Sequence, residues 1–256
     1  NIVKHIDRCL SCYGCMTTCP SNVNYMHIID HGRNYIETNY QRPFLDRILR
    51  DVLSKILPNI ILFKLMSYLA NLIRPFQFFL PSKLRNMIRL MPILFPKKQL
   101  KEKEIYSIKS KKRIARVALL TGCVQKVLSP QINEATIRLL NRHGVEVVVP
   151  KKIRCCGSLN HHLGKADLAH QDFINNINVW YDEYIKGNLD AILSNTSGCG
   201  TTLKDYGFIF RGNKELRKKA KKISELTKDV SEYLYENLKL NFKSKTKKIK
   251  IAYHSA

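Results

Sequence analysis

Residues 114–123 read IARVALLTGC, an apolar run that ends in a Thr-Gly turn and a cysteine. A short apolar run bounded by turn residues predicts a buried β-strand over 114–120. Ser129 and Pro130 then mark a helix start, because serine caps a helix N-terminus and proline suits its first position. Gly144 ends that helix, and the apolar run 145–149 predicts a second strand. This alternation of strand and helix predicts an α/β fold with a parallel sheet flanked by helices.

The alternation continues toward the C-terminus. The pattern predicts a long helix over 165–186, a third strand over 190–193, a helix over 201–206, a basic helical stretch over 214–238 interrupted near Thr227, and a fourth strand over 249–253. The sequence has no Gly-rich phosphate-binding fingerprint, so no motif supports nucleotide binding.

Four cysteines follow the predicted strands. Cys123 comes directly after the first strand, Cys155 and Cys156 follow the second, and Cys199 follows the third. Loops at the carboxyl ends of neighbouring parallel strands meet at one edge of the sheet, so these thiols predict a metal site there. Two alternatives stay open at this point. The cysteines could be small buried apolar side chains, or one could be a catalytic thiol served by the histidines nearby in the sequence.

A second cysteine motif lies near the N-terminus. It has the spacing C-x2-C-x2-C-x3-C-P and comprises Cys9, Cys12, Cys15 and Cys19. This spacing is typical of ferredoxin-type [4Fe–4S] motifs, in which the fourth cysteine binds a neighbouring cluster. Zinc, the alternative for soft thiolates, more usually takes separated pairs of ligands. Because no partner motif occurs in the sequence, we expect the chain to be an internal piece of a longer protein, cut at both ends.

The composition fits a globular chain of one large domain or two smaller ones, with a formal net charge of +24. The basic excess indicates either an anionic partner or solvated helix faces in a lysine-rich chain. No helix-turn-helix or aromatic RNA-binding signature accompanies it, so no nucleic-acid partner is expected. No secretory segment is visible, and adjacent cysteines suit metal ligation better than disulfides, which predicts a cytoplasmic protein.

The region before the α/β pattern divides into two parts. Residues 1–40 hold the ferredoxin-type motif and a helix around 27–35, and residues 41–113 form a connector of short, proline-punctuated helices followed by a charged linker over 97–113. No apolar run in the connector reaches the length of a membrane span. Its helices are both cationic and apolar. They are predicted either to rest peripherally on the inner face of the cell membrane or to pack on the cluster region or a partner subunit.

Several runs of the sequence resemble a known family. They are TGCVQ at 121–125, RHGVEVVVP at 142–150, CCGSLNHHLG at 155–164 and the N-terminal stretch 7–21. The CCG run, with one cysteine upstream and one downstream, resembles the cysteine-rich CCG domain of heterodisulfide-reductase-type electron carriers. More closely, these runs together resemble the iron–sulfur subunits of bacterial glycolate oxidases.

The resemblance implies a longer protein with two ferredoxin-type motifs followed by two CCG modules. This chain would hold the second ferredoxin-type motif in 1–40, the first CCG module in 114–248 and the start of a second module in 249–256.

The resemblance also implies the cluster ligands. Cys9, Cys12 and Cys15 would bind one [4Fe–4S] cluster, and Cys19 would complete the cluster of the other motif. The four cysteines of the CCG module would bind a second cluster, whose type is open because Thr202 stands where the fuller pattern has a fifth cysteine.

The function implied is electron transfer. The chain would be the iron–sulfur subunit of a membrane-associated oxidase of glycolate or another 2-hydroxy acid, passing electrons from an FAD-containing subunit toward quinone, with no substrate-converting residue of its own. Alternatives are a related glycerol-3-phosphate, lactate or heterodisulfide oxidoreductase, a nucleic-acid-binding cluster protein, and a structural zinc protein. His161 and His162 have two interpretations: an imidazole beside the cluster, or a polar turn that does not touch the site.

Overall fold

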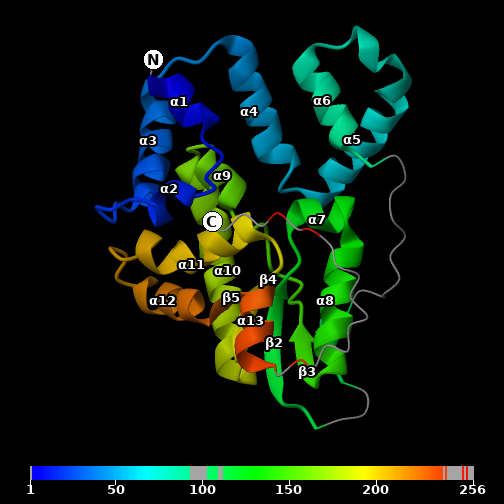
Figure 1. The fold of residues 1–256 in the computed structure, drawn as a ribbon, viewed down its shortest axis with the longest axis vertical. Helices are drawn as coiled ribbons and strands as arrows, with labels where there is room; N and C mark the ends of the chain where they lie inside the picture. The colour runs from blue at the N-terminus through cyan, green and yellow to red at the C-terminus, as the bar shows by residue number, and fades with distance from the viewer. Residues whose placement is uncertain are drawn as a thin grey trace.

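A five-stranded sheet forms the centre of the molecule, which was obtained as a computed structural model describing residues 2–92, 103–108, 112–238, 240, 250 and 252 (Figure 1). Its strands are β1 (Ile105–Tyr106), β2 (Ala115–Leu120), β3 (Val145–Val148), β4 (Ala191–Ser194) and β5 (Thr227–Asp229). The spatial order is β1-β3-β2-β4-β5. β1 is antiparallel to β3 and every other pair is parallel, so the predicted α/β fold with a parallel sheet is confirmed.

Helices cover both faces of this sheet (Figure 1). They are α7 (Cys123–Leu128), α8 (Pro130–Arg142), α9 (Ser158–His162), α10 (Ala166–Gly187), α11 (Ser197–Ile209), α12 (Arg217–Leu226) and α13 (Val230–Asn237). Successive side chains of a strand point to opposite faces. Ala118 and Leu120 of β2 therefore pack in one core with α10, α11 and α12, and Val117 and Leu119 pack in the other core with α8 and α13.

The structure corrects several details of the sequence prediction. The linker 97–113 contains β1, which pairs with β3, and the interruption near Thr227 is a fifth strand, β5, that pairs with β4. The helix predicted over 201–206 is the longer α11, and Cys123 opens an unpredicted short helix, α7. Ser129 and Pro130 begin α8 as predicted, but the serine side chain makes no capping hydrogen bond. Of the strand predicted over 249–253, the structure describes only residues 250 and 252, and neither is assigned to a strand.

Helices of the N-terminal part lie at the end of the sheet where β2 and β4 finish (Figure 1). They are α1 (Ile2–Arg8), α2 (Gly14–Thr17), α3 (Tyr25–Asn39), α4 (Phe44–Ile56), α5 (Ile60–Ile73), the 3-10 helix η1 (Arg74–Phe79) and α6 (Ser82–Leu90). α3 contacts α9, and α5 contacts α7. None of the helices in the described part of the chain has the length and apolarity to cross a bilayer.

Candidate metal centre

The four cysteines of the α/β part come together at the carboxyl edge of the sheet. Cys123 is the first residue of α7 after β2, Cys155 and Cys156 follow β3, and Cys199 lies in the first turn of α11 after β4. The Sγ atoms of Cys123 and Cys155 are 3.4 Å apart, and those of Cys156 and Cys199 are 3.0 Å apart. Three loops thus deliver four thiols to one place, as the strand pattern predicts.

Burial and contact with neighbouring thiols raise the pKa of Cys123, Cys155 and Cys156 and keep these three thiols protonated in the absence of a cation. The hydrogen bond to Cys155 and then burial raise the pKa of the Cys123 thiol. At Cys156 the hydrogen bond with Cys155 lowers the pKa, but the neighbouring Cys199 and complete burial outweigh it and raise that pKa far above the usual range. Thiolate is the form that binds metal, and a positively charged group compensates the charge that burial opposes. This donor set fits a soft, cationic metal group that displaces the thiol protons.

The arrangement of the sulfurs is a row of pairs, not a shell around one point. Cys123 contacts Cys155, Cys155 contacts its neighbour Cys156, and Cys156 contacts Cys199. Within the described residues, no three His, Cys, Asp or Glu side chains are placed to hold a single metal ion. Each cysteine ligand of a cluster binds a different iron atom, so such ligands need not converge on a single point. The row does not converge on one point as the four ligands of a tetrahedral zinc ion do.

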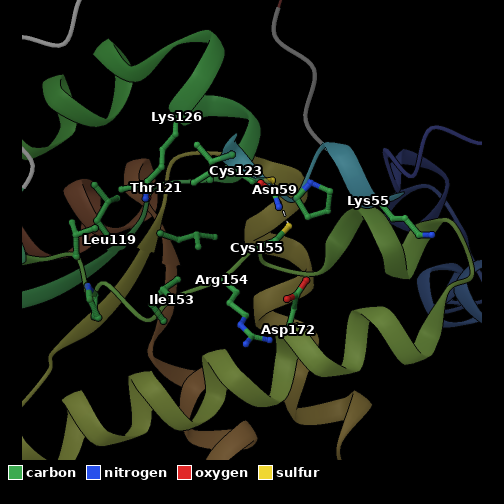
Figure 2. Close-up of a pocket in the computed structure, with 16 residues that line it drawn as sticks. Lys55, Asn59, Leu119, Thr121, Cys123, Lys126, Ile153, Arg154, Cys155 and Asp172 are labelled. Atoms are coloured by element: carbon green, nitrogen blue, oxygen red, sulfur yellow. Dashed lines mark hydrogen bonds between the residues drawn. The ribbon is translucent and has the colours of Figure 1, made fainter. Parts of the chain in front are cut away.

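A cavity of about 390 Å³ opens beside Cys123 and Cys155 (Figure 2). Thr121 and Gly122 line it from the end of β2, and Asn59 lines it from the start of α5. The connector therefore forms one wall of the space next to the thiols. Charged side chains of the lining are Lys55, Lys126, Arg154 and Asp172.

The Asp172 carboxyl, which lines this cavity, lies in an environment that disfavours its charged form. Burial raises its pKa to about 6, although the charge of Arg154 acts in the opposite direction. The unfolded chain ionises this carboxyl at a lower pH, so the folded state loses stability as pH rises from about 4 to about 6. Above about pH 6 the whole free-energy cost of holding a charged Asp172 in the folded state is present.

Asp172→Asn is therefore expected to stabilise the protein at pH 8 by about 1 kcal/mol, a value reduced from the full shift because the side chain is only half-buried. Most of the advantage should vanish near pH 4, where Asp172 is neutral in the folded state and only partly ionised in the unfolded state. Chemical denaturation at the two pH values measures it. Equal stabilisation at both would show that burial does not destabilise the charged form.

Amide side chains, one buried and two half-buried, hold the cysteine loops in place, and their role was not predicted from the sequence. Gln125 Nε2 donates to Asn133 Oδ1 at 2.7 Å and to Asn195 Oδ1 at 2.8 Å. Asn133 Nδ2 donates to the carbonyl of Thr121 at 2.7 Å. This network ties the loop before Cys123 to the loop after β4. The only sequence signal for it is the set of amide residues close to the strand ends.

Two further side chains fix the Cys155-Cys156 segment. Asn176 of α10 is fully buried, accepts from the backbone N–H of Arg154 at 2.9 Å and donates to the carbonyl of Cys155 at 2.7 Å. The hydroxyl of Tyr206 in α11, also fully buried, donates to the carbonyl of Cys156 at 2.9 Å. A buried polar group that loses its partner costs about 1–3 kcal/mol, so both side chains restrict the conformation of this loop.

The ferredoxin-type cysteines lie in the loops around α2. Cys9 follows α1, Cys15 lies within α2, and Cys19 follows it. Cys12 and Cys15 are exposed and the other two are half-buried. No pair among these four described cysteines is in hydrogen-bonding contact, in contrast to the thiols at the sheet edge. The structure therefore places them in one compact segment, with no direct contact between the described sulfurs.

The backbone of this segment nevertheless stabilises the thiolate form of Cys19. Backbone N–H groups of Val23, Ser21 and Asn22 donate to the Cys19 sulfur and lower its pKa. Hydrogen bonds of this kind stabilise a thiolate and tune the potential of a bound cluster. On the other side, the buried Arg33 of α3 donates from Nη2 to the carbonyl of Cys9 at 2.6 Å.

The two histidines after the CCG run contact no cysteine sulfur, as the second interpretation predicts, but both contact a buried carboxylate. His162 Nδ1 lies 2.8 Å from Asp30 Oδ1, and His161 Nε2 lies 3.3 Å from Asp30 Oδ2. Asp30 belongs to α3, the helix that follows the ferredoxin-type motif. The imidazoles thus neither contact a sulfur nor form a turn without a role. They join the two cysteine regions.

Comparisons with known proteins agree with these features. Residues 117–204 match the family model of the cysteine-rich domain, CCG. The chain is 36% identical over 233 residues to the glycolate oxidase iron-sulfur subunit of Escherichia coli, an alignment that covers 91% of this chain and 54% of that protein. It is 27% identical over 250 residues to the probable glycolate oxidase iron-sulfur subunit of Bacillus subtilis, covering 92% and 55%.

A more distant relative is lactate utilization protein A of Geobacillus, 26% identical over 125 residues, which cover 49% of this chain and 50% of that protein. The chain spans about half the length of these curated relatives. No solved structure gives a significant match. With the cysteine-rich domain on the α/β sheet and the ferredoxin-type motif before it, the chain belongs to the family of CCG-domain iron–sulfur proteins that includes the glycolate oxidase iron-sulfur subunits.

Proposed function

We propose that this chain carries electrons through iron–sulfur clusters in an oxidoreductase complex that acts on glycolate or another 2-hydroxy acid. The observation that carries the proposal is the convergence of Cys123, Cys155, Cys156 and Cys199 from three loops at the carboxyl edge of the sheet. A relative that is 36% identical over 91% of this chain is named as a glycolate oxidase iron-sulfur subunit. Lactate utilization protein A supports the wider class and keeps lactate as an alternative substrate of the complex.

The ligands are assigned as follows. Cys9, Cys12 and Cys15 would bind a [4Fe–4S] cluster, and Cys19 would complete a second cluster of the same ferredoxin-type domain. The four thiols at the sheet edge would hold a further cluster. When bound, these clusters supply one-electron carriers, and the chain's own residues position the thiolates, exclude water and set the local charge.

The domain organisation follows from this assignment. Residues 1–40 would be half of a two-cluster ferredoxin-type domain, 41–113 a connector and 114–248 the first CCG module. Residues 249–256 would begin a second module. The connector would shield the cluster of the CCG module, because Asn59 and neighbouring residues line the cavity next to Cys123 and Cys155 (Figure 2).

The substrate chemistry would belong to a partner. No residue of this chain is assigned a role in converting a hydroxy acid, so an FAD-containing subunit would oxidise the substrate and pass electrons here. Quinone would be the acceptor. The remaining alternatives are electron-transfer subunits of the same kind in complexes that act on glycerol-3-phosphate or on a heterodisulfide.

A peripheral membrane contact is supported by the surface of α5, η1 and α6. Large apolar side chains are exposed there, among them Phe79 at 88%, Ile61 at 79% and Leu72 at 73%. The sequence from 60 to 91 has no Asp or Glu but several Lys and Arg residues. An apolar and cationic surface suits a bilayer with anionic head groups. Figure 1 shows these helices projecting from the body of the molecule.

Phe79→Glu is expected to weaken binding to phosphatidylglycerol vesicles by about tenfold or more, because inserting a phenylalanine side chain contributes about 1.5–3 kcal/mol. Co-sedimentation at low and high salt measures the binding. Tyr235→Glu is the matched control, since Tyr235 is equally exposed at 91% but belongs to α13. Equal binding by both variants would contradict the assignment of this surface to the membrane.

The experiment that tests the proposed function is chemical and spectroscopic. Protein purified without oxygen should contain iron and acid-labile sulfide in equal amounts and give an electron paramagnetic resonance signal after reduction with dithionite. Colourless protein that holds zinc or no metal, even after reconstitution with iron and sulfide, would overturn the proposal.

A further inference from the structure

A second cavity, of about 370 Å³, lies between the ferredoxin-type region and the CCG region. α3 forms one wall, and α9, α10 and α11 supply the other. Imidazoles and carboxylates dominate its lining: His27, Asp30, His31, His161, His170 and Asp205. None of these side chains is assigned as a cluster ligand. The cavity is therefore a cluster of titratable groups outside the metal centre.

Asp30 is the centre of this group. Its side chain is only 8% exposed and contacts both His162 Nδ1, at 2.8 Å, and His161 Nε2, at 3.3 Å. Burial acts to raise the pKa of Asp30, but the hydrogen bonds from His161 and His162 outweigh it and hold that pKa below the usual range. At neutral pH the carboxylate is thus charged and accepts a hydrogen bond from each ring.

This geometry leaves one nitrogen on each ring for a further proton. A neutral imidazole that donates one N–H to a carboxylate has its other nitrogen as an acceptor. Here the free positions are Nε2 of His162 and Nδ1 of His161. The side chains are 22% and 17% exposed, so water reaches them. A second proton would convert either ring into an imidazolium that pairs directly with Asp30.

The pair also connects the two cysteine motifs. Arg33, whose Nη1 lies 3.7 Å from Asp30 Oδ1, donates to the carbonyl of Cys9 at 2.6 Å. His161 belongs to the short helix α9, which begins directly after Gly157 of the CCG run. A change of charge at either cysteine motif therefore changes the electrostatic potential at Asp30 and the two imidazoles. The intervening contacts are buried, so salt screens this effect only weakly.

Other titratable groups also lie around the two rings, and two of them form a pair. His27 Nε2 pairs with Asp205 Oδ1 at 2.8 Å on the same cavity. Burial raises the pKa of Asp205 and lowers the pKa of His170. The titratable and charged groups near the two rings include Tyr13 before α2, His27, Asp30, His31 and Arg33 of α3, Arg50 of α4, His170 of α10, Asp205 of α11 and Arg211 beyond its end. His161 and His162 differ from His27 and His170 because they share a charged, buried carboxylate.

We propose that His161 and His162, held on Asp30, bind a proton from water when the adjacent clusters accept an electron, so that this junction couples proton uptake to electron transfer. The proposal rests on the proposed function. In each step one electron from the flavin partner reduces a cluster, and one proton binds an imidazole nitrogen. Oxidation by the acceptor returns both. The added negative charge is compensated within the protein, which keeps the cost of reducing a buried cluster low.

Linkage gives the sign of the effect. If reduction strengthens proton binding, then proton binding strengthens reduction by the same factor. The reduction potential of the coupled cluster should therefore fall as pH rises. For one proton per electron, the equilibrium constant for reduction falls by up to tenfold per pH unit, which corresponds to about 59 mV. The slope should appear in the range where histidine side chains ordinarily change charge, between about pH 5 and pH 8.

The test is a potentiometric titration of the full-length protein, followed by electron paramagnetic resonance, across that pH range. The variant combines His161→Gln with His162→Asn. Glutamine places its amide near the Nε2 position and asparagine near the Nδ1 position, so both can donate to Asp30 without titrating. His143→Asn, in the turn after α8 and outside this cavity, is the matched control.

We expect a pH-dependent potential in the wild type and the His143→Asn control, and a potential that is flat with pH in the double variant with unchanged iron and sulfide content. A wild-type potential independent of pH, or a slope that survives in the double variant, overturns the proposal. If the double variant does not fold, Asp30→Asn should move the slope to lower pH, because the imidazolium loses its carboxylate. An unmoved slope contradicts the proposal. Protein that forms no cluster instead overturns the proposed function and the junction with it.

Discussion

Gly157→Ala is expected to destabilise the α/β region by about 3 kcal/mol or more, since left-handed strain costs about 1–2 kcal/mol and overpacking about 1–3 kcal/mol. Gly157 follows the paired cysteines and has a φ of +78°. An added Cβ would lie 2.3 Å from Cε1 of Phe173 and 3.1 Å from the carbonyl of Ala169. Phe173 is fully buried against Tyr206, so it has no room to move.

Thermal unfolding measures this loss, which should lower the Tm by about 6–12 °C for a chain of this size. The matched control is Gly198→Ala. Gly198 also adjoins a cysteine, but a Cβ there would meet nothing within 4 Å and the residue is helical. Alanine favours a helix by up to about 1 kcal/mol over glycine, so the control should be neutral or slightly stabilising. Equal losses in the two variants would contradict the steric argument.

Cys156→Ser is expected to remove the cluster of the CCG module, lowering iron and sulfide by the content of that one cluster while the ferredoxin-type signal persists. Cys156 is 3% exposed, and its sulfur lies 3.0 Å from that of Cys199. A hydroxyl is a much poorer ligand for iron than a thiolate. The substitution changes one atom of similar size, so the surrounding core has little reason to rearrange.

The reciprocal variant separates the two sites. Cys12→Ser changes an exposed cysteine of the N-terminal motif and should remove the ferredoxin-type signal alone. Combining the two substitutions should remove both signals. Full iron content in Cys156→Ser would exclude this residue as a ligand, and loss of all iron in that single variant would show that the two sites do not assemble independently. Circular dichroism verifies that each variant keeps its fold.

Sequence reasoning worked best where a pattern is local. The apolar run before Cys123 and the proline at the start of a helix predicted β2 and α8, because strand burial and the backbone preference of proline are local properties. It failed at β1 and β5. Each has only two or three residues, and each becomes a strand because the edge of the sheet offers it hydrogen bonds. Local propensity carries no sign of that partner.

The candidate metal centre shows the same division. Parallel-strand topology alone implied that cysteines after consecutive strands would meet, and the structure places their sulfurs in contact. The residues that hold the loops, Asn133 and Asn176, were missed because an amide side chain has no distinctive spacing. Their role follows from hydrogen bonds to backbone groups far away in the sequence.

The sequence by itself thus determined the α/β class, the two cysteine motifs and the family to which they belong. These are properties of spacing and periodicity along the chain. Only the tertiary structure decided that His161 and His162 turn toward Asp30, more than a hundred residues earlier, and that the connector lines the cavity beside Cys123. Contacts between distant segments depend on how whole helices pack, and packing is settled by the shape and burial of many side chains together.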